Sequence, residues 1–477
     1  MTTKVVAGTL AVIPLTLEGV IHSIAVTIGN AHAAAGTAAT LPVYVTAYDA
    51  SGAAIVGPGY YGAPITLSDG DASGITALSA TTVTKPGASV QLAYNGKSIA
   101  SATIGASATA VTPANVTSGA FTPTPTLVAS YPIPSSLGVK TAALAIASGP
   151  DGNIWFTTQY CSFCSAPKGT NAIVEMSTSG VVLNTYVAGT APGLTGPTAN
   201  FFGITAGPDG NLWFTDATNN AIGRITIPGN TIQEFSAGTL CPNRIVAGPP
   251  SDGGLWFTST CNSSIGHIAL GTTPTITPYS LSGFGGGTSY QGIAAGSDHN
   301  LYLVDDQYAG NHRIGQVTIA AGAVTGFSEV TVPNAPDGQP NLQLLGIAQT
   351  SDGELWFTDN GCTASVVGSI VIKSPFTSST VNEFPTPTGC QTPAYLTAVP
   401  DGSRLFVTSW DYPAIEQVVP TTPGAAPATT NYAYEIPTQN GTFQETWDIT
   451  IGPDGNVWAT SYTPAGTDLN NIVKLAY

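Results

Sequence analysis

The sequence predicts an all-β protein in which a seven-bladed β-propeller, closed by an N-terminal strand, follows an immunoglobulin-like β-sandwich. A repeated phrase carries most of this prediction, and its clearest copy, Ile-Thr-Ala-Gly-Pro-Asp-Gly-Asn-Leu-Trp-Phe-Thr-Asp, spans residues 204–216. Its turn aspartate recurs with spacings of 58, 43, 46, 54, 49 and 53 residues, at Asp151, Asp209, Asp252, Asp298, Asp352, Asp401 and Asp454. Repeats of this length are typical of arrays in which each unit is one multi-stranded blade that packs on its neighbours.

Each repeat unit contains four segments with the character of β-strands. In the second unit, residues 203–206 are a short apolar run, a Pro-Asp-Gly-Asn turn follows, and residues 212–215 read Leu-Trp-Phe-Thr. Pro, Asp, Gly and Asn favour tight turns, and aromatic and β-branched residues favour strands. The third and fourth segments read Ala-Ile-Gly-Arg-Ile-Thr over 221–226 and Ile-Gln-Glu-Phe over 232–235. Four such strands predict one blade per unit.

The two ends of the repeat region complement each other. The last unit ends after residues 471–475 without a fourth strand, whereas residues 128–133 have the character of a fourth strand and precede the first unit. We expect the early strand to complete the last blade, because closing the ring removes the exposed edges of a linear array. The propeller then covers residues 126–477.

Residues 1–125 differ from the repeats, because they contain no copy of the phrase, no cysteine and no tryptophan. Short alternating segments at 41–48, 64–67, 89–94 and 100–104 predict a β-sandwich followed by a linker. Residues 20–27 and 47–52 resemble bacterial immunoglobulin-like surface domains of the invasin type. The apolar run at 5–17 is interrupted by Gly8 and Pro14, so we do not expect a secretory signal peptide there.

The phrase Gly-Pro-Asp-Gly-Asn-Leu-Trp-Phe-Thr, followed by Ile-Gly-Arg-Ile, resembles the repeat of the virginiamycin B lyase (streptogramin lyase) family. The resemblance covers the C-terminal three quarters of the chain. It implies a propeller and a magnesium-assisted eliminase that linearises a cyclic depsipeptide. It also implies histidines two residues before the first-strand isoleucine, which is leucine in the sixth unit, and glutamates after Trp-Phe-Thr or near the start of the first strand.

The positions that match those of the family carry other residues. The histidine positions are filled by Leu144, Phe202, Asn243, Gln291, Leu345, Ala394 and Trp447. The glutamate positions after Trp-Phe-Thr are filled by Thr158, Asp216, Ser259, Asp305, Asp359, Ser409 and Ser461. Proton abstraction beside a carbonyl needs a base within reach, and the expected imidazole is missing. We therefore do not expect streptogramin lyase activity, and no residue is predicted to be catalytic.

Three aspartates and one histidine are candidate ligand-binding residues. Asp216, Asp305 and Asp359 could place negative charge at the mouth of the ring and hold calcium or magnesium. The alternative is that they are turn and loop aspartates that accept hydrogen bonds from nearby backbone amides. His312, close in sequence to Asp305, could serve in an acid–base or metal site, or could be a solvated loop histidine. His267 is expected at a solvated outer-strand position.

Aromatic residues on the same face suggest a binding platform. Phe202, Trp410, Tyr412 and Trp447 are candidates, since exposed aromatic rings at loop tips suit a glycan or peptide. The alternative is that these rings pack over the top of the core.

All six cysteines are expected at one end of the strands. We expect Cys241 to pair with Cys261 inside one blade, Cys362 to pair with Cys390 between blades, and Cys161 to pair with Cys164. An even number with local partners favours disulfides and an oxidising compartment. The competing interpretation, a zinc site, needs a second Cys-x-x-Cys pair that the sequence lacks.

The composition indicates an extracellular protein. The chain has 11 Lys plus Arg against 27 Asp plus Glu, and a net charge of -16 disfavours nucleic acid and anionic membranes as partners. No apolar run reaches the length of a membrane span. Only 8% of the residues are charged, so we also expect tolerance of acidic conditions.

We expect a secreted or cell-surface propeller used for binding, adhesion or assembly, with no required cofactor. Its partner would be a glycan, a peptide, a protein or further copies of itself. The alternatives are a metal-assisted extracellular lyase or hydrolase that uses the propeller mouth, and a structural subunit of a surface layer or filament.

Overall fold

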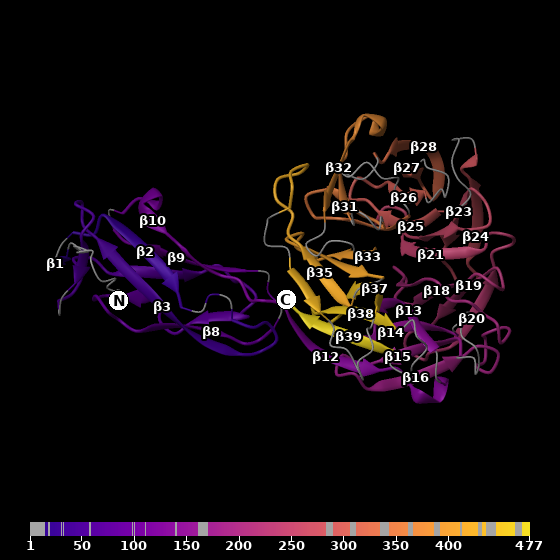
Figure 1. Cartoon of the computed structure of the whole chain (residues 1–477), viewed down its shortest axis with the longest axis horizontal. Helices are drawn as coiled ribbons and strands as arrows, with labels where there is room; N and C mark the ends of the chain where they lie inside the picture. Colours follow the sequence, from indigo (N-terminus) through magenta and orange to yellow (C-terminus); the bar gives the residue numbers. More distant parts are fainter. Residues whose placement is uncertain are drawn as a thin grey trace. The chain divides into compact units, whose positions relative to one another are not determined.

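The computed structural model describes residues 15–17, 20–29, 31, 33–56, 59–97, 99, 101–109, 111–138, 141–160, 170–282, 290–305, 312–333, 343–360, 366–385, 392–410, 413–427, 432–435, 445–462 and 470–477. The chain forms two compact units. The first unit is Met1–Thr126 with Ala476–Tyr477, and the second is Leu127–Leu475. The regular structure in the described residues is almost entirely β-strand (Figure 1).

The described residues of the first unit form two sheets. One sheet has the order β1 (Leu15–Leu17), β4 (Ala54–Val56), β3 (Ala39–Tyr48), β2 (Ser23–Ile28) and β10 (Val116–Thr117), with β8 (Val90–Tyr94) paired to β3 and to β6 (Thr76–Leu78). The other has the order β11 (Gly119–Phe121), β9 (Ala102–Ser107), β5 (Ile65–Asp69) and β7 (Thr82–Val83).

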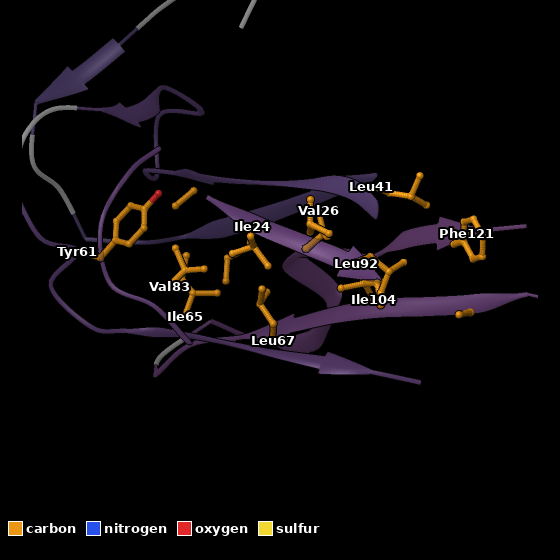
Figure 2. Close-up of a cluster of buried hydrophobic side chains, with 14 of the residues drawn as sticks. Ile24, Val26, Leu41, Tyr61, Ile65, Leu67, Val83, Leu92, Ile104 and Phe121 are labelled. Atoms are coloured by element: carbon orange, nitrogen blue, oxygen red, sulfur yellow. The ribbon is translucent and has the colours of Figure 1, made fainter. Parts of the chain in front are cut away.

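Both sheets contribute to one hydrophobic core (Figure 2). Burial alternates along the strands, so that Ile65 and Leu67 of β5 point inward while the residues after them are exposed. Leu92 of β8 and Ile104 of β9 are fully buried in the same cluster. This period of two is what a strand with one face on a core requires, and it explains the alternating patterns in this part of the sequence.

The second unit contains, among its described residues, seven four-stranded antiparallel sheets. Sheet one is β13 (Thr141–Ser148), β14 (Ile154–Tyr160), β15 (Ala172–Met176) and β16 (Val182–Val187). Sheet two is β17 (Ile204–Ala206), β18 (Leu212–Asp216), β19 (Ala221–Ile225) and β20 (Ile232–Ser236). Sheet three is β21 (Pro242–Ala247), β22 (Leu255–Ser259), β23 (Ser264–Ala269) and β24 (Thr275–Ser280). Sheet four is β25 (Tyr290–Ala295), β26 (Leu301–Asp305), β27 (Arg313–Ala320) and β28 (Ala323–Thr331). Sheet five is β29 (Leu344–Gln349), β30 (Leu355–Asp359), β31 (Val366–Val371) and β32 (Thr380–Pro385). Sheet six is β33 (Pro393–Ala398), β34 (Leu405–Ser409), β35 (Ala414–Val418) and β36 (Tyr432–Glu435).

Sheet seven is built from both ends of the second unit. Its strands are β37 (Glu445–Ile451), β38 (Val457–Tyr462), β39 (Asn471–Ala476) and β12 (Thr126–Pro132), so the early strand fills the fourth place, as the sequence predicted. The first strands of the sheets contact one another in chain order, and β37 also contacts β13. The seven sheets therefore form a closed ring (Figure 1).

The repeated phrase shapes the turn between the first two strands of a sheet. In sheet two, Trp213 Nε1 donates a hydrogen bond of 3.1 Å to Asp209 Oδ1, and the indole is fully buried. A Cβ atom at Gly207 would lie 2.6 Å from the Trp213 ring, so a larger residue here would displace the indole from its position beside Asp209. The same indole-to-aspartate bond occurs in sheets one, three and seven.

The threonine of the phrase joins neighbouring sheets. Thr215 Oγ1 accepts a hydrogen bond of 2.9 Å from Gly203 N in its own sheet and donates one of 2.6 Å to the Asn243 carbonyl in the next sheet. Five other sheets repeat this arrangement, through Thr157, Thr258, Thr358, Thr408 and Thr460. In sheet four the position is Val304. We call these six residues the clamp threonines.

Candidate functional site

The first strands of the seven sheets surround a cavity of about 160 Å³ at the centre of the ring. We call it the central cavity. It is lined by Ile146, Gly203, Ile204, Arg244, Ile245, Gly292, Ile293, Gly346, Ile347, Tyr395, Leu396 and Asp448. Glycines on three strands let the backbones approach closely; a Cβ atom at Gly292 would lie 2.5 Å from the Leu345 carbonyl oxygen. The space is therefore narrow, and the larger polar side chains dominate its wall.

Arg244 and Asp448 form an ion pair across the central cavity. Arg244 Nη1 lies 2.9 Å from Asp448 Oδ2, and the two side chains are only 12% and 13% exposed. Asp448 Oδ2 also accepts a hydrogen bond of 3.2 Å from Ile146 N. Burial lowers the pKa of Arg244, but Tyr395 and Asp448 outweigh that effect and raise it, so the guanidinium stays charged. This network links sheets three, seven and one.

Three aromatic rings pack in sequence beside this ion pair, and we call Tyr395, Trp447 and Trp410 the aromatic series. The Arg244 guanidinium lies 3.7 Å from the centre of the Tyr395 ring, a close cation–π contact. Tyr395 packs against Trp447 with ring centres 5.7 Å apart, and Trp447 packs edge to face on Trp410 at 4.9 Å. Trp410 and Trp447 are each partly exposed. The structure therefore brings these two predicted binding residues together, with Tyr395 between them and the cation.

The other two aromatic candidates are Phe202 and Tyr412. Phe202 is half-buried just before β17, and no contact places it beside the tryptophans. Tyr412 lies outside the described residues.

Asp216, Asp305 and Asp359 end the second strands of sheets two, four and five, and each is at most 1% exposed. Asp216 accepts hydrogen bonds from the backbone N–H groups of Asn200 and Asn219, both at 3.1 Å, and from the Asn219 side chain at 2.7 Å. This is the loop-organising role that the sequence left open as the alternative. Among the described residues, no three His, Cys, Asp or Glu side chains lie close enough together to hold a metal ion.

Each of the three aspartates lies beside a glutamate on the fourth strand of its own sheet. Burial raises the pKa of Glu234 and of Glu329, and the charges of Asp216 and Asp305 respectively add to the effect, while Thr195 and Arg313 oppose it. Burial raises the pKa of Glu383 to about 7, although a hydrogen bond with Asp359 lowers it in part. These acid pairs were not visible in the sequence because each forms between the second and fourth strands of a sheet, across the third strand.

The solvated positions considered for His312 and His267 are wrong, because both residues are buried. His312 is only 5% exposed, because it directly precedes β27, and its carbonyl accepts a hydrogen bond of 2.9 Å from Val332 N. His267 is only 7% exposed, because its ring packs on Trp256 with centres 4.5 Å apart and Nε2 lies 3.3 Å from Asp252 Oδ2. Burial lowers the pKa of His267, although Asp252 opposes the shift.

The predicted disulfide between Cys241 and Cys261 is confirmed. Cys241 lies just before β21, and Cys261 follows β22, so the bond ties the start of the strand that carries Arg244 to its neighbour. Cys161, Cys164, Cys362 and Cys390 lie outside the described residues.

Comparison with known proteins settles the family. The sequence profile described as "Virginiamycin B lyase family" matches residues 139–467. This chain belongs to the virginiamycin B lyase family. A search of curated protein sequences finds no match.

The chain is also similar to solved structures of virginiamycin B lyases. A catalytically inactive variant of the Staphylococcus aureus enzyme with quinupristin has a TM-score of 0.56 and 24% identity, covering 74% of this chain and 100% of the other. The selenomethionine form of the S. aureus enzyme has a TM-score of 0.53 and 24% identity, covering 71% and 96%. A streptogramin B lyase structure has a TM-score of 0.55 and 24% identity, covering 74% of this chain and 97% of the other. At this identity the likeness shows the β-propeller fold alone.

The positions implied for the catalytic histidines of virginiamycin B lyases carry uncharged side chains in this family member. Asn243 Nδ2 donates a hydrogen bond of 3.0 Å to Gln291 Oε1, and Trp447 belongs to the aromatic series. Neither arrangement supplies an imidazole base. Asp216, at an implied glutamate position, accepts hydrogen bonds from its own loop, and the described residues include no group of three His, Cys, Asp or Glu side chains that could hold a magnesium ion.

The predicted site residues did not include Arg244, Tyr395 or Asp448. Each stands directly before the first-strand isoleucine or leucine, at a position that is glycine or alanine in the other four units. Three large polar residues at an otherwise small position were the signal that could have revealed them.

Proposed function

We propose that this chain is a secreted or cell-surface binding protein that uses the virginiamycin B lyase scaffold without streptogramin lyase activity. In this proposal the seven sheets are the blades of a seven-bladed propeller closed by β12. The first unit is an immunoglobulin-like module, spanning residues 1–125 with its linker, that spaces or attaches the propeller at residues 126–477.

The observation that carries the proposal is the composition of the ring mouth. Trp410 and Trp447 present partly exposed aromatic surface, and the buried Tyr395 connects it to the Arg244–Asp448 ion pair. Such side chains supply binding area at a small entropic cost, as in recognition of a glycan, a peptide or a protein.

One further observation supports an extracellular setting. The Cys241–Cys261 disulfide persists in oxidising compartments. The net charge of -16 disfavours nucleic acid as a partner. Among the described residues, no helix is long and apolar enough to cross a membrane.

The test combines turnover and binding. Purified full chain is incubated with quinupristin and magnesium, with the S. aureus lyase as positive control, and chromatography follows ring opening. We expect no linear product. Ring opening by this chain would contradict the proposal and favour the alternative, a metal-assisted lyase or hydrolase.

Binding is measured on arrays of glycans and peptides with the wild type, Trp447→Ala and Trp410→Ala. Tyr60→Ala is the control, because Tyr60 is 76% exposed in the first unit. We expect both tryptophan variants to lose signal while the control keeps it. An array without hits, together with filaments or sheets of the pure protein under the electron microscope, would instead indicate a structural subunit.

A further inference from the structure

A second cavity lies away from the ring mouth, at the junction of sheets one and two. It has a volume of about 600 Å³ and is open to solvent. We call it the asparagine groove. It is lined by Asp151, Asn153, Glu175, Asn184, Tyr186 and the hairpin residues 227–230 between β19 and β20. The turn aspartates of the phrase, here Asp151, mark the opposite strand ends from Cys241 and Trp410.

Glu175 explains why this junction is open. In the sheet ladder it lies opposite Trp155, where sheets two and seven place Arg224 opposite Trp213 and Lys474 opposite Trp458. The two cations reach into the hairpin between the third and fourth strands of the next sheet. Arg224 donates to the Gly271 and Thr272 carbonyls at 2.8 and 3.1 Å, and Lys474 donates to the Thr178 carbonyl at 3.1 Å.

The glutamate side chain at this position is shorter than arginine or lysine, and its carboxylate cannot donate hydrogen bonds to the carbonyls of the next hairpin. The Glu175 carboxylate, in a residue only 5% exposed, instead accepts three side-chain amides. Asn153 donates at 2.7 Å, Asn184 at 2.6 Å and Asn230 at 3.0 Å. Asn230 belongs to the hairpin of sheet two, so these amides bridge the junction at its base and leave the space above them unfilled.

The carboxylate fixes the orientation of the amides. Asn184 and Asn230 each donate one N–H to Glu175, and Asn230 also forms a hydrogen bond with the Tyr186 side chain. An asparagine side chain has a second N–H and an acceptor oxygen, which Asn184 can offer to a ligand. Both residues line the asparagine groove. Tyr186 adds a rigid aromatic wall, because its ring stacks on Trp155 with centres 6.1 Å apart and an interplanar angle of 10°. The wall therefore combines preorganised amides with one aromatic ring.

This chemistry selects an uncharged, hydrogen-bonding ligand. None of the described lining residues is positively charged, and the Asp151 and Glu175 carboxylates repel anions. Glu175 already has three donors, so it offers little to a cation. Fixed amides suit hydroxyl groups, which both donate and accept, and an aromatic ring suits the apolar face of a sugar. We propose that the asparagine groove binds an uncharged saccharide.

Isothermal titration of the full chain tests this proposal. The probes are a fixed panel of neutral sugars at millimolar concentration: the methyl glycosides of glucose, galactose, mannose and N-acetylglucosamine, and their 1,4-linked disaccharides. We expect saturable binding of at least one probe. Asn184→Ala should weaken it at least tenfold, and Tyr186→Ala should weaken it similarly.

Gln233→Ala is the matched control, because Gln233 stands opposite Arg224 in sheet two as Asn184 stands opposite Glu175 in sheet one. We expect it to leave affinity unchanged. Three results would overturn the proposal: no binding across the panel, equal affinity in Asn184→Ala and the control, or binding only of calcium or of lysine and arginine peptides. Trp447→Ala should bind the sugar normally, which separates this site from the proposed function of the ring mouth.

Discussion

Thr460 Oγ1 donates a hydrogen bond of 2.8 Å to the Leu144 carbonyl, 316 residues earlier in the chain. The same hydroxyl accepts a hydrogen bond of 2.9 Å from Asp448 N. This pair of hydrogen bonds joins sheets seven and one. It has the same form as the pairs that join sheets adjacent in the sequence. The ring is thus closed in its inner layer by the same repeated threonine that connects its consecutive sheets.

The clamp threonines predict a specific cost of mutation. Thr215→Val keeps the shape but leaves Gly203 N–H and the Asn243 carbonyl without this partner, so we expect the free energy of unfolding to fall by about 3 kcal/mol. All seven tryptophans lie in the second unit. Urea unfolding followed by tryptophan fluorescence therefore reports on that unit.

Val304 provides the opposite test of the same joint. Val304→Thr should supply the missing joint of sheet four and raise the free energy of unfolding by about 1 kcal/mol. A stabilised Thr215→Val or a strongly destabilised Val304→Thr would contradict this account of ring cohesion.

The Arg244–Asp448 pair should behave as a coupled unit. Arg244→Met leaves the Asp448 carboxylate without its cation in a narrow cavity. We therefore expect the free energy of unfolding, measured in urea, to fall by about 3 kcal/mol. The double variant with Asp448→Asn should lose less than the sum of the two single variants, by about 1–3 kcal/mol. Additive losses would show that the pair contributes no coupling.

Reduction of the Cys241–Cys261 disulfide should weaken the second unit. The bonded residues are 20 positions apart, and a loop of this length gives a stabilisation of about 3 kcal/mol in the chain-entropy account. We expect a reductant to lower the urea midpoint of the wild type more than that of the Cys241→Ser/Cys261→Ser variant. Equal shifts would assign the effect to other cysteines. Mass mapping without reduction should recover the linked peptides.

The raised pKa of Glu383 predicts that the folded protein gains stability from this group in mild acid. Its pKa in the folded state is about 7, above the ordinary value of 4.5, so the folded protein holds this proton more tightly. The stabilisation is complete below about pH 4.5 and is lost as the pH rises through about 7. Because Glu383 is partly exposed, we expect a loss of about 1 kcal/mol after solvent screening.

Other groups oppose this trend. The lowered pKa of Asp454 removes stability as the pH falls through its folded-state value, below the ordinary 3.8, and the lowered pKa of His267 removes it below about 6.5. Urea unfolding at pH 5 and pH 8 is therefore compared between the wild type and Glu383→Gln. Parallel pH profiles for the two proteins would contradict the prediction.

Local sequence patterns predicted the strands of the second unit well, because each strand is set by neighbouring residues. The phrase containing Trp213 and Asp209 specifies a turn and the strand after it, and both occur where the sequence placed them. The pairing of β12 with β39 followed from counting strands at the two ends. The first strand of a sheet was also expected, although its bulges were not.

The candidate site was less predictable, because it depends on contacts between distant units. Trp410 and Trp447 were selected, but Tyr395 and Arg244, which complete the series, were not. His267 was expected in solvent because the family phrase has arginine there. Its burial depends on packing against Trp256 and on the approach of Gly322 from the next sheet, whose added Cβ would lie 2.7 Å from the His267 ring.

The clamp threonines also bear on how such a ring could have grown. A duplicated unit brings with its threonine both an acceptor for its own first strand and a donor for the strand that follows, so a new copy can join its neighbours at once without a compensating change elsewhere. Units could thus be gained or lost by unequal recombination while the joints survived. Val304 shows that a ring of this kind tolerates one copy in which this pair of hydrogen bonds is missing.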